Sequence, residues 1–169
     1  MTNTWLNGDG LFIKYGTTEG AVGKGGQISD MGPYRILEFT IGYADVASAT
    51  ATILDDNIFI PDNSFIAKVE VVTTTAWDSG GDAFVFNLGT VAYDRTTEVD
   101  YNGLIAALPQ GSMDPAGEWE VIDVEHTYKG AQVGTVIAQP TYVTVDYDTA
   151  APTAGASKVR IYFYATANE

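Results

Sequence analysis

The sequence contains no cysteine, and its only histidine is His126. The absence of cysteine excludes disulfides, thiolate metal sites and Cys-His catalysis. A Ser-His-Asp triad would have to use His126, which lies between a predicted strand and a turn at Lys129 and Gly130, and no GxSxG motif accompanies it. We therefore expect an exposed histidine without a catalytic role, and a protein that is not an enzyme.

Basic residues are also scarce. Eight Lys and Arg residues stand against 22 Asp and Glu residues, which gives a net charge of -14. Nucleic acid is not an expected partner, because binding phosphate needs a basic surface. The same charge makes identical copies repel one another, so self-association has to rely on burial or on counterions.

Long apolar runs are missing as well. The apolar runs at 58–60 and 161–163 are far shorter than the roughly 20 residues that span a bilayer. The amino terminus has neither a basic region nor an apolar region of the kind found in secretory signals. We expect no membrane partner and no export signal.

The residues that are abundant are typical of β-structure: 18 glycines accompany many Thr, Val and Tyr residues. The segment 58–88 organises the chain, since two stretches of alternating apolar and polar residues flank a glycine turn at 78–82. This pattern predicts a hairpin that seeds a sheet. Its predicted core positions are Phe65, Ala67, Val69, Val71, Phe84, Phe86 and Leu88.

Further strands are predicted at 34–41, 52–54, 91–93, 119–124, 133–138, 142–147 and 158–165, separated by turn residues. The only helix candidate is 101–108, with Asp100 as its N-terminal cap and Pro109 after its end. Eight or nine strands at this spacing predict an all-β, antiparallel β-sandwich, a jelly roll or a related Greek key. We expect one sandwich domain at 33–169, preceded by an extended arm at 1–32.

The predicted arm is rich in glycine, and residues 16–26 show no periodicity. It nevertheless carries Trp5, Leu11, Phe12 and Tyr15, which are too apolar for a free tail. These side chains either pack on their own domain or dock on a neighbouring molecule, and the sequence leaves both possibilities open.

Acidic turns at 55–57, at Asp78 and Asp82, and at Asp146 and Asp148 offer the oxygen ligands that Ca²⁺ prefers. None of them matches an EF-hand loop, and Asp and Asn are also common in turns for backbone reasons alone. The sequence therefore predicts no metal site and no cofactor.

Several aromatic residues could form a sugar-stacking platform on one sheet face or a subunit interface, because Tyr and Trp are common in both. Tyr162 and Tyr164 lie on the polar side of the last predicted strand, which makes them candidate contact residues. The full set is Trp77, Trp119, Tyr142, Tyr147, Tyr162 and Tyr164.

Three segments, 7–20 (NGDGLFIKYGTTEG), 52–108 and 143–164 (VTVDYDTAAPTAGASKVRIYFY), resemble small structural proteins of tailed-bacteriophage heads, in particular capsid decoration (cement) proteins. The resemblance implies a non-enzymatic virion protein that decorates and stabilises the outer capsid surface. It also implies synthesis in the host cytoplasm, the major capsid protein as partner, and assembly into a homotrimer. The capsid and subunit contacts would involve Trp5, Leu11, Phe12, Tyr15, Tyr162 and Tyr164.

The alternative is a carbohydrate- or receptor-binding β-sandwich module of a phage tail or fibre. Such a module would share the same composition, and its surface Tyr and Trp residues would then form the ligand platform.

Overall fold

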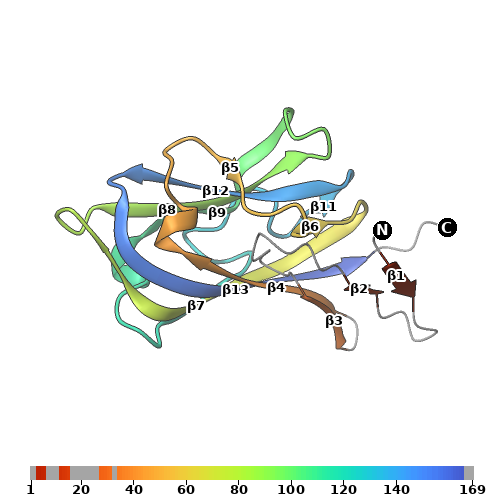
Figure 1. The fold of residues 1–169 in the computed structure, drawn as a ribbon, viewed down its shortest axis with the longest axis horizontal. Helices are drawn as coiled ribbons and strands as arrows, with labels where there is room; N and C mark the ends of the chain where they lie inside the picture. Colours follow the sequence, from red (N-terminus) through yellow and green to blue (C-terminus); the bar gives the residue numbers. More distant parts are fainter. Residues whose placement is uncertain (1–2, 7–11, 16–26, 32–33, 166–169) are drawn as a thin grey trace.

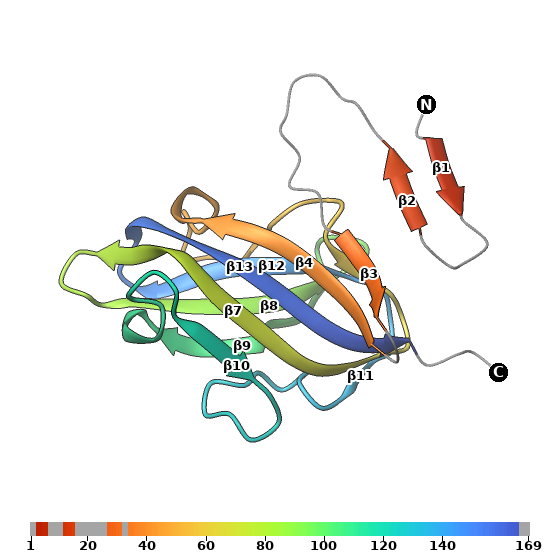
Figure 2. The same cartoon turned by 90° about the horizontal axis from the view of Figure 1, so that it is seen from below.

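The computed structural model describes residues 3–6, 12–15, 27–31 and 34–165, with side chains placed for residues 35–164. Two large β-sheets pack face to face, and a separate hairpin of β1 (Asn3–Leu6) and β2 (Phe12–Tyr15) lies to one side (Figures 1 and 2). All strand pairs are antiparallel, which confirms the predicted all-β sandwich. No helix of the described residues is long and apolar enough to cross a membrane.

The first large sheet runs in the order β10-β7-β13-β4-β3, and β11 also pairs with β7. The second runs in the order β5-β12-β8-β9, and β6 also pairs with β12. The strands of the first sheet are β3 (Gln27–Met31), β4 (Tyr34–Gly42), β7 (Ser64–Ser79), β10 (Trp119–Ile122), β11 (Val136–Ile137) and β13 (Pro152–Ala165). Those of the second are β5 (Thr52–Ile53), β6 (Phe59–Ile60), β8 (Phe84–Ala92), β9 (Glu98–Pro109) and β12 (Thr141–Thr149).

The main strands in chain order are β4, β5, β7, β8, β9, β10, β12 and β13. Numbered one to eight in that order, they stand as 6-3-8-1 in one sheet and 2-7-4-5 in the other. Among these eight strands, the chain therefore crosses to the other sheet at every step except that from β8 to β9, which is the order of a jelly roll.

The alternation predicted for the first and last clear strands is confirmed. In β13, Val159, Ile161 and Phe163 are buried between the sheets, and in β4 Leu37 and Phe39 are buried opposite them. The polar residues of both strands lie on the other side. Each of these strands therefore contributes one apolar face to the shared core.

The predicted hairpin at 58–88 is wrong, because its two arms pair in different sheets. β7 pairs with β10, β11 and β13, whereas β8 pairs with β9 and β12. The turn after β7 carries the chain across the sandwich, so the apolar sides of the two strands face each other. Trp77 of β7 stacks on Phe84 of β8 with ring centroids 5.0 Å apart.

The core positions predicted in β7 are correct at Val69 and Val71 and wrong at Phe65 and Ala67. A β-bulge explains the change: Tyr162 pairs with Lys68, but the next residue of β13, Phe163, pairs with Ile66. Ala67 is thus the extra residue, and Ile66 takes the buried position.

The predicted helix at 101–108 is wrong, because these residues belong to β9. The register between β8 and β9 shifts between the pair Thr90–Asp100 and the pair Leu88–Ile105, so β9 bulges outward there. Leu104 and Ile105 are both buried although they are neighbours in sequence. The helix-like spacing of the apolar residues therefore comes from a bulged strand.

The residues predicted as an arm, 1–32, include β3, which pairs with β4 and belongs to the first large sheet. The strands β1 and β2, by contrast, pair only with each other among the described strands. The described residues before β3 therefore contribute no strand to the two large sheets, and the division into arm and domain stays a prediction.

Candidate functional site on the outer face of the first sheet

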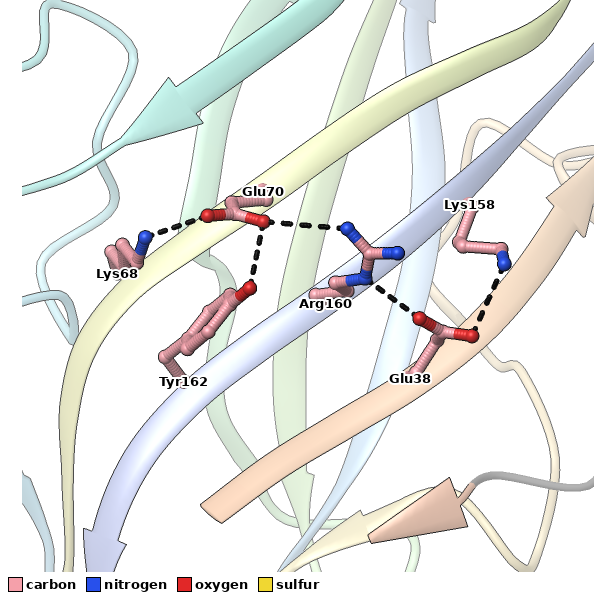
Figure 3. Close-up of polar contacts among 6 residues, drawn as sticks. All are labelled: Glu38, Lys68, Glu70, Lys158, Arg160 and Tyr162. Carbon is pink, nitrogen blue, oxygen red and sulfur yellow. Dashed lines mark hydrogen bonds and ion pairs between the residues drawn. The ribbon is translucent and has the colours of Figure 1, made fainter. Parts of the chain in front are cut away.

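A compact polar network lies on the outer face of the first sheet (Figure 3). Its central residue is Glu70 of β7, which is only 3% exposed although it points away from the core. The carboxylate accepts hydrogen bonds from Lys68 Nζ at 2.6 Å and from the Tyr162 hydroxyl at 2.8 Å. Arg160 Nη1 lies 3.7 Å from the same group. Neighbouring side chains thus cover and satisfy this carboxylate.

The network continues across β13 to β4. Arg160 donates from Nε to Glu38 Oε2 at 2.6 Å, and Lys158 Nζ lies 3.2 Å from Glu38 Oε1. The hydrogen bond from Arg160 is the main reason that the pKa of Glu38 is lowered. Arg160 is directly opposite Glu38 on one side and Glu70 on the other, and such cross-strand charge pairs stabilise a sheet.

Tyr162 has a defined place in this network. Lys68 Nζ lies 4.3 Å from the centre of the Tyr162 ring, and the Tyr162 hydroxyl donates a hydrogen bond to Glu70. Burial and the bond to Glu70 raise the pKa of Tyr162, so the hydroxyl stays protonated and keeps donating. The network fixes the ring on the sheet surface. Fixed aromatic and charged side chains of this kind are suited to contact with another molecule.

Tyr164 continues the same face and begins a more apolar region. Its ring lies 6.0 Å from that of Phe65, and Phe65 pairs with Val136 of β11 at the edge of the sheet. Both tyrosines predicted as contact residues therefore lie on one outer face. Whether they contact a subunit or a capsid stays a prediction.

Three of the four amino-terminal candidates lie on the β1–β2 hairpin. Trp5 pairs with Ile13, Phe12 with Leu6, and Tyr15 with Asn3. Leu11 lies outside the described residues. The contacts predicted for these four residues stay a prediction.

The six aromatic residues considered for a sugar platform do not share one face. Trp77 is buried in the core, and Tyr142 and Tyr147 belong to the second sheet. Tyr142 is itself covered, since the ring of Tyr93 stacks on it at 5.6 Å. The prediction of a common platform is wrong, which removes the main support for a carbohydrate-binding module.

Most contacts of the acidic turns come from neutral groups of the protein, and Asp56 pairs with Arg95 Nη2 at 2.9 Å. Asn57 donates to Asp55 through its backbone and side-chain nitrogens, and Asn87 Nδ2 donates to both Asp146 and Asp148 at 2.8 and 2.9 Å. No three side chains of the kinds that bind metals come together within the described part of the chain. These acidic residues accept hydrogen bonds within turns and between neighbouring strands.

Asp146 is the most buried of these carboxylates, and we predict that Asp146→Asn leaves the protein at least as stable at pH 7. Burial raises the pKa of Asp146, and the negative charge of Asp148 raises it further. The hydrogen bond from Asn87 acts in the opposite direction. The native state then holds the Asp146 proton more tightly than the unfolded chain does. Protonated Asp146 therefore stabilises the native state below about pH 4, and this stabilisation is lost as the pH rises through the pKa of Asp146 in the native state.

Melting temperatures measured from pH 3 to 8 test this prediction. The gap between variant and wild type should close below about pH 4, where Asp146 is neutral in both states. Asp148→Asn, at an exposed position, is the control with a smaller effect. A variant less stable than wild type at pH 7 would contradict the assignment.

His126 is half-buried, so the expectation of an exposed histidine is wrong. Its Nε2 lies 3.3 Å from Glu120 Oε2, and its Nδ1 accepts a hydrogen bond from the backbone N–H of Tyr128 at 3.2 Å. The contact with Glu120 ties the turn after β10 to that strand, and the bond from Tyr128 lies within the turn. They give His126 a structural role in that turn.

No family model and no curated protein matches the sequence. The fold, however, is similar to chains in three solved structures. A chain of the cyanophage Pam1 capsid asymmetric unit aligns with a TM-score of 0.54 at 11% identity, covering 91% of this chain and 94% of that one. A chain from the capsid of Ralstonia phage GP4 gives a TM-score of 0.51 at 15% identity, covering 81% and 87%.

A chain from the acidic stable capsid structure of Helicobacter pylori bacteriophage KHP30 gives a TM-score of 0.50 at 10% identity, covering 79% of this chain and 88% of that one. At these identities the likeness shows a common fold. It extends over most of both chains in each comparison.

Proposed function

We propose that this protein is a structural component of a tailed-bacteriophage head, and that it decorates and stabilises the capsid from its outer surface. The observation that carries the proposal is the similarity in fold to chains from three phage capsid structures, over 79–91% of this chain. The surface is in keeping with it, because the outer face of the first sheet presents fixed aromatic and charged side chains. Its partner is the major capsid protein, and it is made in the host cytoplasm.

Co-sedimentation tests this function. Purified protein is mixed with capsids assembled from the major capsid protein of the same phage, and the capsids are pelleted. The proposal expects saturable binding at a fixed ratio of the two proteins. Protein that stays in the supernatant at every concentration would overturn it.

We predict that the isolated protein forms a trimer, with a mass of about 54 kDa from three copies of 18.0 kDa. Since each copy carries a net charge of -14, salt should strengthen the association by screening the repulsion. Light scattering over micromolar concentrations at low and physiological salt measures both effects. A single 18 kDa species throughout would contradict the prediction.

A further inference from the structure

Three exposed apolar side chains lie along one edge of the first sheet. Of the five large apolar side chains that are exposed in the described part of the chain, three lie here: Trp119 at 59%, Val124 at 45% and Val136 at 51%. The side chain of Val124 lies close to Gly134, and Gly134 precedes Val136 by two residues. Exposed apolar side chains along one edge make that edge a candidate interaction surface.

The same edge has unpaired backbone. β10 pairs with Val69–Val72 and β11 with Ser64–Phe65, so both lie along one side of β7. Among the described strands β7 is their only neighbour, and we call this side the β10–β11 edge. Such an edge can accept another strand. Figure 2 shows β3 at the opposite side of the sheet.

The amino-terminal hairpin needs a partner of this kind. β1 and β2 have four residues each and pair with no strand of the large sheets. A two-stranded hairpin alone is marginally stable in water, and it becomes stable when it joins a larger sheet or covers an apolar surface. Its sequence supplies apolar residues for this purpose, among them Trp5, Phe12 and Ile13.

We propose that the β1–β2 hairpin of one copy docks on the β10–β11 edge of a second copy. This inference rests on the proposed function and specifies how the copies of the decorating protein join. β3, the first described strand after the hairpin, lies at one edge of the first sheet and β10 at the other, so the arm is joined to the side opposite the receiving edge. A contact of this head-to-tail kind closes into a ring when the rotation fits, as in a trimer.

Charge favours this contact over others. Residues 1–26 hold Asp9, Glu19, Lys14 and Lys24 and thus have no net side-chain charge, so residues 27–169 carry the whole -14. The arm is the segment that a second copy can approach with the least repulsion. The receiving edge exposes Asp123 and Glu125 beside Val124, which complement the two lysines.

Cross-linking between single-cysteine variants tests the contact, since the natural chain has no cysteine. Thr4→Cys in one chain and Val136→Cys in a second, differently tagged chain are mixed and treated with a short bismaleimide. We expect a cross-linked pair of about 36 kDa, twice 18.0 kDa. Thr153→Cys, at an exposed position on β13 remote from the edge, replaces Val136→Cys as the control and should give no product.

Two outcomes overturn the inference. One is the absence of a cross-link between chains. The other is a double variant, Thr4→Cys with Val136→Cys, that cross-links only within a single chain, which would show that the arm covers its own domain.

A second measurement covers the case in which a cysteine variant folds poorly. Trp119→Asp should weaken self-association roughly tenfold or more. Tyr43→Asp, at an exposed aromatic position outside the edge, should leave it unchanged, and circular dichroism checks that both fold. If Trp119→Asp associates like wild type, the docking inference fails. The proposed function fails separately, if wild type does not sediment with capsids.

Discussion

Deletion of residues 1–26 leaves the sandwich folded and abolishes attachment to capsids and to neighbouring copies. Both large sheets keep all their strands, because the first of them in sequence, β3, begins at Gln27. The deleted segment holds Trp5, Phe12 and Tyr15, residues of the kind that dominate interfaces. An extended arm gains contact area when a partner orders it, so its loss removes binding and not folding.

Circular dichroism and thermal melting report folding of the truncated protein, and co-sedimentation with capsids and light scattering report attachment. The full-length double variant Trp5→Ala and Phe12→Ala should reproduce most of the defect, which separates the side chains from the length of the arm. If the truncated chain unfolds, or sediments with capsids as well as full-length protein does, the role given to the arm is wrong.

Trp77→Ala lowers the free energy of unfolding by about 3–5 kcal/mol, the range for removing a large aromatic side chain from a core. The indole is 1% exposed and stacks on Phe84, and its Nε1 donates to the Ser157 hydroxyl at 2.8 Å. The substitution leaves a large cavity between the sheets and a buried hydroxyl without its donor. Chemical denaturation at a fixed protein concentration measures the change, and a loss below about 1 kcal/mol would contradict this placement.

Gly155→Ala tests the same contact from the other side. A Cβ on Gly155 would lie 2.4 Å from the Trp77 ring, and the residue has φ +130°, a conformation that side chains rarely adopt. Overpacking of a core costs about 1–3 kcal/mol, and backbone strain adds to it. Gly111→Ala is the matched control, since a Cβ there meets nothing within 4 Å and the change should stay within about 0.5 kcal/mol.

Alternation of apolar residues predicted the strands that have one buried face, and it did so best in β4 and β13. It could not predict which strands pair. β7 and β8 have the pattern and the turn of a hairpin, but a hairpin and a crossing between sheets both place apolar residues on one side of each strand. Here the stacking of Trp77 on Phe84 between the sheets accompanies the crossing.

β-Bulges explain the other differences between the predicted and the observed strands. One extra residue at Ala67 moved Phe65 to the outer face, and the bulge in β9 gave Leu104, Ile105 and Leu108 a helical spacing. A bulge depends on the partner strand, so a single sequence carries little sign of it.

The candidate site was predictable only in part. The alternation of apolar and polar residues predicted that Tyr162 and Tyr164 lie on the polar side of the last strand, and the structure places them there. The burial of Glu70 depends on side chains from β13, more than 80 residues away in sequence, so it could not be read from the residues around it. The β10–β11 edge could not be predicted either, because Trp119 and Val136 lie along the same side of the sheet only through their common neighbour β7.

A reconstruction of the purified phage particle tests the central claim most directly. We expect density for this jelly roll on the outer surface of the capsid shell, with the β1–β2 hairpin of each copy bound to another copy. Density for the protein in the tail or fibres, or its absence from the particle, would contradict the claim.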